Sequence, residues 1–369
     1  MNTDPESSFS STCRIQDIAN ALNLAKSTVS LALRNNSKIA LKTKKRVQEK
    51  AKEMGYRPNP FVQANMLNVR KPNSLPSQPI IAFISDTFQP ESGKLPKPIQ
   101  SYYEGSIERA NTLGFKVESF GLKQDHYTGE SLSKVLSHRG ILGAIIPPLV
   151  DKSLGKIDLR WESMATATIG YTLSSPAISR VFFDPFGTLF NTLTRVVARG
   201  YKRIGFLLTE EMDLREGNQW SSSFLGFRQF LPETYSCQML RAPKLERPKI
   251  LEWLKTNKPE CVVVLGMSTV NTLKELGYRT PDDLAVVFAF WREGEPNYAG
   301  YEHPFKAIAA AAVDIVVSQL YRNELGIPQN QKTTLINSIW REGFSLPGKE
   351  LSENLPKKLK EHIVWPTQF

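Results

Sequence analysis

The sequence of 369 residues is poor in cysteine and histidine, with three and four of them. The cysteines, Cys13, Cys237 and Cys261, are odd in number and far apart, which argues against a disulfide framework. They favour reduced thiols in a cytoplasmic protein. The histidines show no metal-ligand spacing, and no motif indicates a bound cofactor. We therefore expect a protein without metal or cofactor.

Long apolar runs and glycine-rich loops are also missing. No apolar run approaches the ~18–20 residues that a membrane span needs, so we expect no membrane partner. The start, MNTDPESSFSST, has neither the basic residues nor the apolar core of a signal peptide. No phosphate-binding loop appears, and Gly266-Met267-Ser268 lacks the second glycine of a nucleophile elbow. These absences argue against an enzyme.

What is present is positive charge near the N-terminus. Residues 12–71 contain thirteen Lys and Arg residues and three acidic ones, a net charge of +10 out of +11 for the whole chain. The remainder of the chain is therefore nearly neutral. A positive field gathered in one short segment is typical of proteins that contact the phosphates of nucleic acid.

The same segment has the pattern of three short helices. Residues 14–34 read as two amphipathic helices joined by a turn at Asn23, a residue type that tolerates the left-handed conformation. A third helix is expected over residues 42–54, ended by Gly55. The predicted inward positions are Ile15, Ile18, Ala19, Leu22, Val29, Ala32, Leu33, Val47, Ala51 and Met54. Two helices with a tight turn are typical of the helix-turn-helix, whose second helix enters the major groove of DNA.

Beyond a Pro/Ser-rich linker at residues 71–79, apolar strands alternate with helices. Candidate strands lie at residues 80–84, 115–120, 143–146, 166–169, 180–183, 203–208, 235–240, 261–265 and 284–289. Candidate helices lie at residues 101–113, 129–138, 186–199, 219–230, 247–256 and 305–324. This alternation predicts a doubly wound α/β architecture with buried parallel strands.

The N-terminal segments DIANALNLAKSTVSLALRN and LKTKKRVQEKAKEMGYRPNP resemble the LacI/GalR (lactose-repressor) family of bacterial transcription regulators. The motifs that carry the resemblance are D-[IV]-A, S-T-V-S, K-T-x-x-x-V and G-Y-x-P-N, in this order. It continues through ARGYKRIGFL, ELGYRTPDDLAVV and WREGFSLP, and so covers residues 14–347. The resemblance implies two α/β lobes, as in periplasmic sugar-binding proteins, with crossings between them near residues 177, 301 and 326.

The expected organisation is an all-α headpiece followed by a two-lobed periplasmic-binding-protein-like α/β domain with two doubly wound parallel sheets. The segments are a disordered N-terminus (1–11), a helix-turn-helix headpiece (12–59), a hinge helix and linker (60–79), an effector-binding and dimerisation domain (80–347) and a tail (348–369). For the tail, a frayed end is favoured over a short docking helix.

By position, the resemblance implies which residues meet DNA. The residues expected to read bases are Lys26, Ser27 and Leu31. The other expected DNA contacts are Arg14, Gln16, Thr28, Ser30, Arg34, Lys38, Thr43, Tyr56, Asn59 and, in the hinge helix, Asn65. Leu31 stands where many relatives carry Arg, so we expect weaker hydrogen-bond readout there. Ala25 and Ala40 replace the Ser or Thr usual at helix N-caps. Asn65 replaces a leucine that wedges into the minor groove, which puts central DNA kinking in doubt.

The resemblance also implies a small-molecule effector between the lobes, yet the usual polar anchors are missing. Ser223 stands where an arginine is usual, and Phe290 and Trp291 stand where acids are common. Together with Trp220 and Tyr301, these are the candidate effector-binding residues. Two interpretations stay open: a pocket that stacks on a sugar or a flat heterocycle, or aromatic side chains that fill a cleft without a ligand.

These features and the resemblance predict a sequence-specific transcription regulator, in the first place a repressor. The resemblance implies that it binds a pseudo-palindromic operator in double-stranded DNA as a homodimer and responds to a small molecule in the interlobe cleft. The alternative is an effector-independent, weakly specific, architectural DNA-binding protein with a degenerate ligand pocket. A third interpretation, a solute-binding protein with a vestigial headpiece, is opposed by the charge of the headpiece.

Overall fold

The structure, a computed structural model, describes residues 15–33, 39–56, 78–86, 97–122, 127–150, 155–291 and 297–362. The chain forms two compact units, and each is described by itself. They are Met1–Ser77 with Val317–Glu324, and Gln78–Val316 with Leu325–Phe369. The predicted disordered N-terminus and the predicted hinge helix lie outside the described residues.

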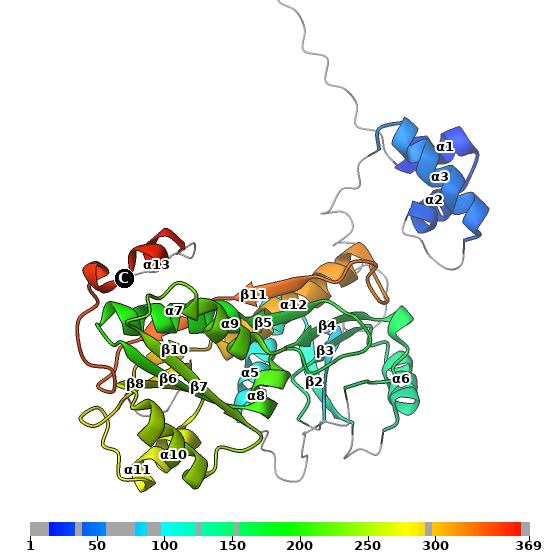
Figure 1. Cartoon of the computed structure of the whole chain (residues 1–369). Coiled ribbons are helices and arrows are strands. Elements are labelled where there is room, and N and C mark those ends of the chain that lie inside the picture. The colour runs from blue at the N-terminus through cyan, green and yellow to red at the C-terminus, as the bar shows by residue number, and fades with distance from the viewer. Residues whose placement is uncertain are drawn as a thin grey trace, which may run out of the picture. The chain divides into compact units, whose positions relative to one another are not determined.

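The headpiece of the first unit consists of three helices (Figure 1). They are α1 (Ile15–Leu22), α2 (Lys26–Leu33) and α3 (Leu41–Glu53). One face of each helix is apolar, and these faces form a common core. The buried side chains are Ile18, Ala19, Leu22, Val29, Ala32, Val47 and Ala51, with Ile15, Leu33, Met54 and Tyr56 packed against them. The predicted inward faces are therefore confirmed.

The ends of these helices follow from single residues. Asn23 has φ +51°, and the amide of Leu24 donates to the carbonyl of Ala19 at 3.0 Å, so α1 stops after Leu22. Gly55, at φ +65°, ends α3 as predicted. Ala40 precedes α3 without a side-chain cap, as expected from the missing hydroxyl.

The first lobe of the second unit is built on a six-stranded parallel sheet of order β11-β5-β4-β3-β1-β2. The strands are β1 (Ile80–Ser85), β2 (Lys116–Gly121), β3 (Gly143–Ile146), β4 (Ala165–Ile169), β5 (Arg180–Phe183) and β11 (Thr333–Ile336). Helix α6 (Gly129–His138) and the turn η2 (Trp161–Ser163) bury apolar side chains against one face. Phe83 of β1 meets Tyr103 of α5 (Lys97–Thr112) on the other face.

Helix α12 (Phe305–Arg322) lies against α5. A Cβ added at Gly105 of α5 would lie 2.6 Å from the Cα of Lys306, so only glycine permits this close approach. Arg109 Nε pairs with Asp314 Oδ1 at 2.7 Å, and Lys306 Nζ pairs with Glu108 at 2.7 Å. Both ion pairs are exposed and so contribute little to stability.

The second lobe is built on a sheet of order β12-β10-β9-β8-β6-β7, parallel except for the edge strand β12. The strands are β6 (Arg203–Thr209), β7 (Ser236–Ala242), β8 (Cys261–Val264), β9 (Ala285–Trp291), β10 (Gly300–Glu302) and β12 (Ile339–Arg341). The helices are α7 (Pro185–Ala198), α8 (Glu210–Arg215), α9 (Gln219–Arg228), α10 (Arg247–Asn257) and α11 (Met267–Glu275). Figure 1 shows α10 and α11 on one side of this sheet and α7 and α9 on the other.

The predicted two-lobed α/β fold is confirmed, with differences at the crossings. The chain leaves the first lobe after Phe183, later than residue 177, because Asp184 caps α7, which packs on α9. It returns after β10, close to the expected residue 301. The last crossing follows β11, at residues 337–338 rather than near 326. The crossing near residue 326 was expected from the resemblance; the chain crosses later because the strand TTLI still pairs with β5 of the first lobe.

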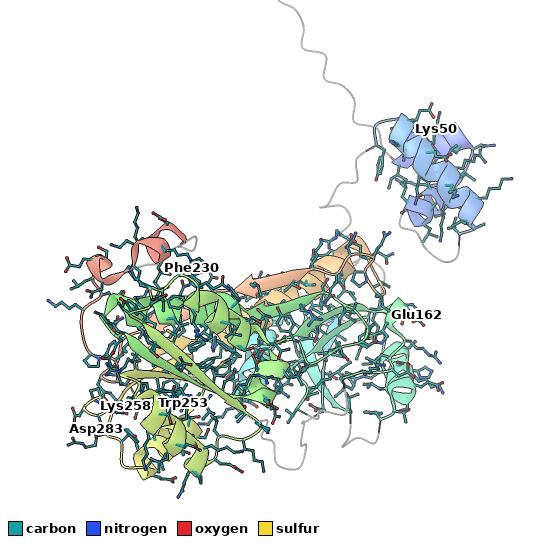
Figure 2. The ribbon with its side chains drawn as sticks, viewed as in Figure 1. Lys50, Glu162, Phe230, Trp253, Lys258 and Asp283 are labelled. Atoms are coloured by element: carbon teal, nitrogen blue, oxygen red, sulfur yellow. The ribbon has the colours of Figure 1, made fainter. Side chains whose placement is uncertain are left out.

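The C-terminal tail is docked as far as it is described, which corrects the expected frayed end. After the turn η3 (Ser352–Asn354), helix α13 (Lys357–His362) buries Leu359 completely. Lys358 Nζ donates to the carbonyl of Gln229 at 2.6 Å and lies 6.0 Å from the ring of Phe230 (Figure 2). The expectation failed because the tail makes contacts such as that of Lys358 with Gln229, which join residues more than a hundred positions apart.

Candidate functional sites

Helix α2 presents a polar surface opposite its buried face. Val29 and Ala32 are buried in the headpiece core, whereas Lys26 and Ser27 in the first turn are exposed. Thr28, Ser30 and Leu31 are half-buried. This arrangement is the one that a recognition helix needs, since its first turn must reach base edges while its other side holds the helix in place.

The remaining candidate DNA contacts are spread over α1 and α3. Gln16 is exposed, and its Nε2 donates to Asn20 Oδ1 at 3.0 Å within α1. Thr43 lies in the first turn of α3, and Tyr56 packs against the core. Arg14, Arg34, Lys38, Asn59 and Asn65 lie outside the described residues. The DNA-contact assignments of all these residues stay predictions.

The basic side chains of α3 are not equivalent. Lys42, Lys45 and Lys52 are exposed, and Lys50 (labelled in Figure 2) pairs with Glu53 at 2.9 Å. Arg46 is exposed as well, but it reaches back to α1, where its Nη2 donates to the carbonyl of Leu22 at 3.1 Å. The sequence gave no signal for this contact, which joins residues 24 positions apart.

In the second unit, a cluster of rings joins the two lobes. Phe183 ends β5, and its ring centroid lies 5.8 Å from that of Trp220 on α9 and 5.6 Å from that of Phe290 on β9. Phe305 begins α12, 6.0 Å from Phe290 and 5.3 Å from Tyr102 on α5. These rings are all buried. With His303, we call them the interlobe aromatic cluster.

His303 lies where the three crossings meet. Its ring is 3.9 Å from that of Phe183 at the first crossing, and His303 itself belongs to the second. Its Nδ1 is 2.7 Å from Ser338 Oγ at the third crossing, and its Nε2 is 3.2 Å from the carbonyl of Ala289. Because a carbonyl only accepts, Nε2 donates to Ala289, and Nδ1 and the Ser338 hydroxyl share the second hydrogen bond. One side chain therefore connects all three crossings.

The five candidate effector residues do not gather in one place. Trp220 and Phe290 meet through Phe183 in the interlobe aromatic cluster. Ser223 is buried, and its Oγ donates to the carbonyl of Phe186 at 2.8 Å. Trp291 packs against the apolar core under α10 and α11. Their role in ligand binding stays a prediction.

Tyr301 belongs to a different group of side chains. Its hydroxyl accepts from Arg195 Nε at 3.2 Å, and Arg195 also binds both carboxylate oxygens of Glu350, at 2.8 and 2.9 Å. The guanidinium lies 4.8 Å from the ring of Trp340 on β12. This group fastens the segment after β12 to α7, which is a structural contact.

Two buried polar atoms at the start of α9 have no hydrogen-bond partner among the described residues. They are Glu216 Oε2 and Trp220 Nε1. Burial raises the pKa of Glu216 to about 8, although Arg215 partly offsets this effect. At neutral pH, Glu216 is therefore mainly a neutral carboxylic acid.

Other chemistry is sparse in the part of the chain that the structure describes. No three His, Cys, Asp or Glu side chains are grouped so that they could hold a metal ion. Cys237 and Cys261 are buried, and burial raises the pKa of both thiols, that of Cys237 to about 12. No described helix is long and apolar enough to cross a membrane.

Sequence reasoning did not identify Phe183, His303 and Phe305 as parts of the interlobe aromatic cluster. Phe183 is the last residue of β5, Phe305 is the first of α12, and His303 lies between β10 and α12. Nothing in their local sequence distinguishes them from ordinary core or loop residues, so the sequence offered no signal. Their contacts depend on the way that three distant chain segments converge.

Comparison with known proteins agrees with this architecture. The family described as "Bacterial regulatory proteins, lacI family" matches residues 14–59. The HTH-type transcriptional regulator DegA of Bacillus subtilis (strain 168) is 24% identical over 291 residues, which are 74% of this chain and 80% of DegA. The lac repressor dimer bound to operator and the anti-inducer ONPF is 16% identical, with a TM-score of 0.50 over 91% of this chain and 99% of that one. The transcriptional regulator CelR in complex with cellobiose is also 16% identical, with a TM-score of 0.50 over 90% and 99%.

The two solved structures share the fold of this chain, and the family match covers its described helix-turn-helix. Residues 14–59 therefore resemble the helix-turn-helix segment of the lacI family of bacterial regulatory proteins, and the chain as a whole is similar to the transcriptional regulator DegA.

Proposed function

We propose that the protein binds a pseudo-palindromic operator in double-stranded DNA as a homodimer and represses transcription, without catalytic activity. The observation that carries this proposal is the arrangement of α2. Its buried side, Val29 and Ala32, fixes the helix, while Lys26 and Ser27 are exposed in its first turn. A two-fold dimer with two such helices reads two half-sites of opposite orientation.

The chemistry of α2 favours moderate base discrimination. Lys26 can donate to the O6 and N7 acceptors of guanine, whereas Leu31 can only contact a thymine methyl or exclude water. The net charge of +10 over residues 12–71 adds affinity that does not depend on sequence. The ratio of the affinity for operator DNA to the affinity for random DNA should therefore depend on few contacts.

Selection from a random duplex pool with the full-length protein, at near-physiological salt, tests the proposal. We expect enrichment of one pseudo-palindrome whose half-sites lie about one helical turn apart. Retention of DNA without an enriched sequence would contradict sequence-specific recognition. Sedimentation of the protein with the enriched duplex then gives the stoichiometry, which should be two chains per site.

The effector would be a sugar or a flat heterocycle. The lac repressor structure contains the anti-inducer ONPF, and CelR is in complex with cellobiose, which supports a small molecule such as a sugar. The interlobe aromatic cluster favours a second candidate, a regulator without an effector, because Phe183, Trp220 and Phe290 are packed against one another and buried.

Operator binding in the presence of small molecules distinguishes these two candidates. The probes are cellobiose, lactose, adenine and guanine, each at millimolar concentration. A ligand that binds the two lobe arrangements differently must change operator affinity. A change with any probe supports the effector-controlled regulator. If titration calorimetry detects no heat of binding for any probe and the operator affinity stays unchanged, the regulator without an effector is supported.

A further inference from the structure

At the turn between α1 and α2, a side chain of α3 reaches the end of α1. Within the turn, the amide of Asn23 donates to the carbonyl of Asn20 at 3.2 Å, and the amide of Leu24 donates to that of Ala19 at 3.0 Å. The carbonyl of Leu22, the last residue of α1, accepts from Arg46 Nη2 at 3.1 Å. The donor comes from α3, so this bond ties α3 to the end of α1, immediately before the turn that leads to α2.

The position of this bond makes it important for α2. Only residues 23–25 separate α1 from α2, and Ala25 has no side-chain oxygen to cap α2. A left-handed residue, Asn23, lies in the turn at φ +51°. The direction of α2 therefore depends on how firmly this short segment is held. A guanidinium at the C-terminal end of α1 is also favoured by the helix dipole.

We propose that Arg46 is a positioning residue for DNA recognition, which holds the turn before α2 through the carbonyl of Leu22 instead of serving as a phosphate contact. The proposal rests on the proposed sequence-specific binding. It separates Arg46 from its neighbour Lys45, which is exposed on the same helix and serves as the matched control.

The test uses full-length Arg46→Met, Arg46→Lys and Lys45→Met proteins. Affinities for the selected operator and for random DNA are measured over a range of salt concentrations, well below the unfolding temperature of each variant. Met removes the donors of Arg46 at similar length, whereas Lys keeps a donor group and the charge. We expect Arg46→Met to lower the ratio of operator to random affinity by about fivefold or more. The salt slope should stay unchanged, Arg46→Lys should restore most of the ratio, and Lys45→Met should leave the ratio unchanged.

Two other results would overturn the proposal. A phosphate contact predicts that Arg46→Met weakens both affinities together and reduces the salt slope by about 0.9, the value for one neutralised phosphate. A purely structural role predicts an equal loss of both affinities, from a smaller active fraction, without a change in their ratio. No effect on either affinity would also overturn it.

Hydrogen exchange in the DNA-free protein keeps this test separate from the proposed function. Arg46→Met should accelerate exchange of the Leu24 amide, and Lys45→Met should not. Unchanged exchange in Arg46→Met overturns the role of Arg46 whatever the DNA results are. A wild-type protein without a preferred DNA sequence contradicts the proposed function, while accelerated exchange would still support the contact with the turn.

Discussion

Lys26 is the residue on which we expect base discrimination to depend most. It is exposed in the first turn of α2, where side chains of a recognition helix meet base edges. Lys26→Ala should lower affinity for the selected operator by about 1–3 kcal/mol and relax preference at one base pair of each half-site. Competition binding with single-base operator variants measures this. The control is Lys52→Ala, a change at an exposed position late in α3, which should change the affinity for all duplexes alike. An unchanged operator affinity in Lys26→Ala would contradict the placement of α2.

Glu216 makes stability depend on pH. Its pKa is about 8 in the folded chain against the usual 4.5, because the carboxyl is buried. Between these pH values the folded chain holds a proton that the unfolded chain has lost. The contribution of this proton to the free energy of unfolding is therefore fully present below about pH 4.5, decreases as the pH rises and is lost above about pH 8. The total loss is a few kcal/mol. Calorimetry should show Glu216→Gln melting higher than wild type at pH 9 but not at pH 4.5. An equal difference at both pH values would argue against a buried, protonated Glu216.

At the scale of single elements, the uncapped start of α3 is a local weakness. Ala40 precedes the helix with extended backbone, φ −59° and ψ 143°, but offers no oxygen to the first-turn amides. Ala40→Ser should stabilise the headpiece by about 0.5–2 kcal/mol. Thermal unfolding of the headpiece, followed by circular dichroism, measures the gain. Ala21→Ser, at an exposed position inside α1, supplies no cap and should give no gain.

The docking of α13 depends on Leu359, whose side chain is completely buried. Leu359→Ala removes apolar area and leaves a cavity, so we expect the helix to detach more often, at a cost of about 2–4 kcal/mol. Limited digestion with trypsin, which cuts after Lys357 and Lys358, should become clearly faster. The neighbouring Lys360→Ala changes an exposed residue and should leave the cleavage rate at these sites unchanged.

At the scale of the whole two-lobed unit, the three crossings share the side chain of His303. Its ring packs on Phe183 and bonds to Ser338 and to the carbonyl of Ala289. His303→Ala should destabilise the unit by about 2–4 kcal/mol and broaden the range of lobe arrangements. Small-angle scattering should show a larger radius of gyration than wild type. His138→Ala, at the exposed end of α6, is the control, and identical scattering from both variants would contradict this role.

Local patterns in the sequence were sufficient for most of the elements, although helices α8 and α11 were not predicted. Apolar spacing placed the inward faces of α1, α2 and α3, and Asn23 and Gly55 marked where helices end, because these features depend on residues within one or two turns. Apolar runs such as CVVV predicted the buried parallel strands. The strands β10, β11 and β12 were missed, since three or four residues of mixed polarity carry no periodic signal.

The sequence by itself determined the charged three-helix headpiece, the alternation of strands and helices and the family motifs, because each depends on residues that are neighbours in the chain. Only the tertiary structure decided three other features. Arg46 reaches Leu22, the tail packs beside Phe230, and His303 joins segments that end near residues 183 and 338. Each contact joins residues between 24 and more than a hundred positions apart, and it exists only once the helices and sheets have packed.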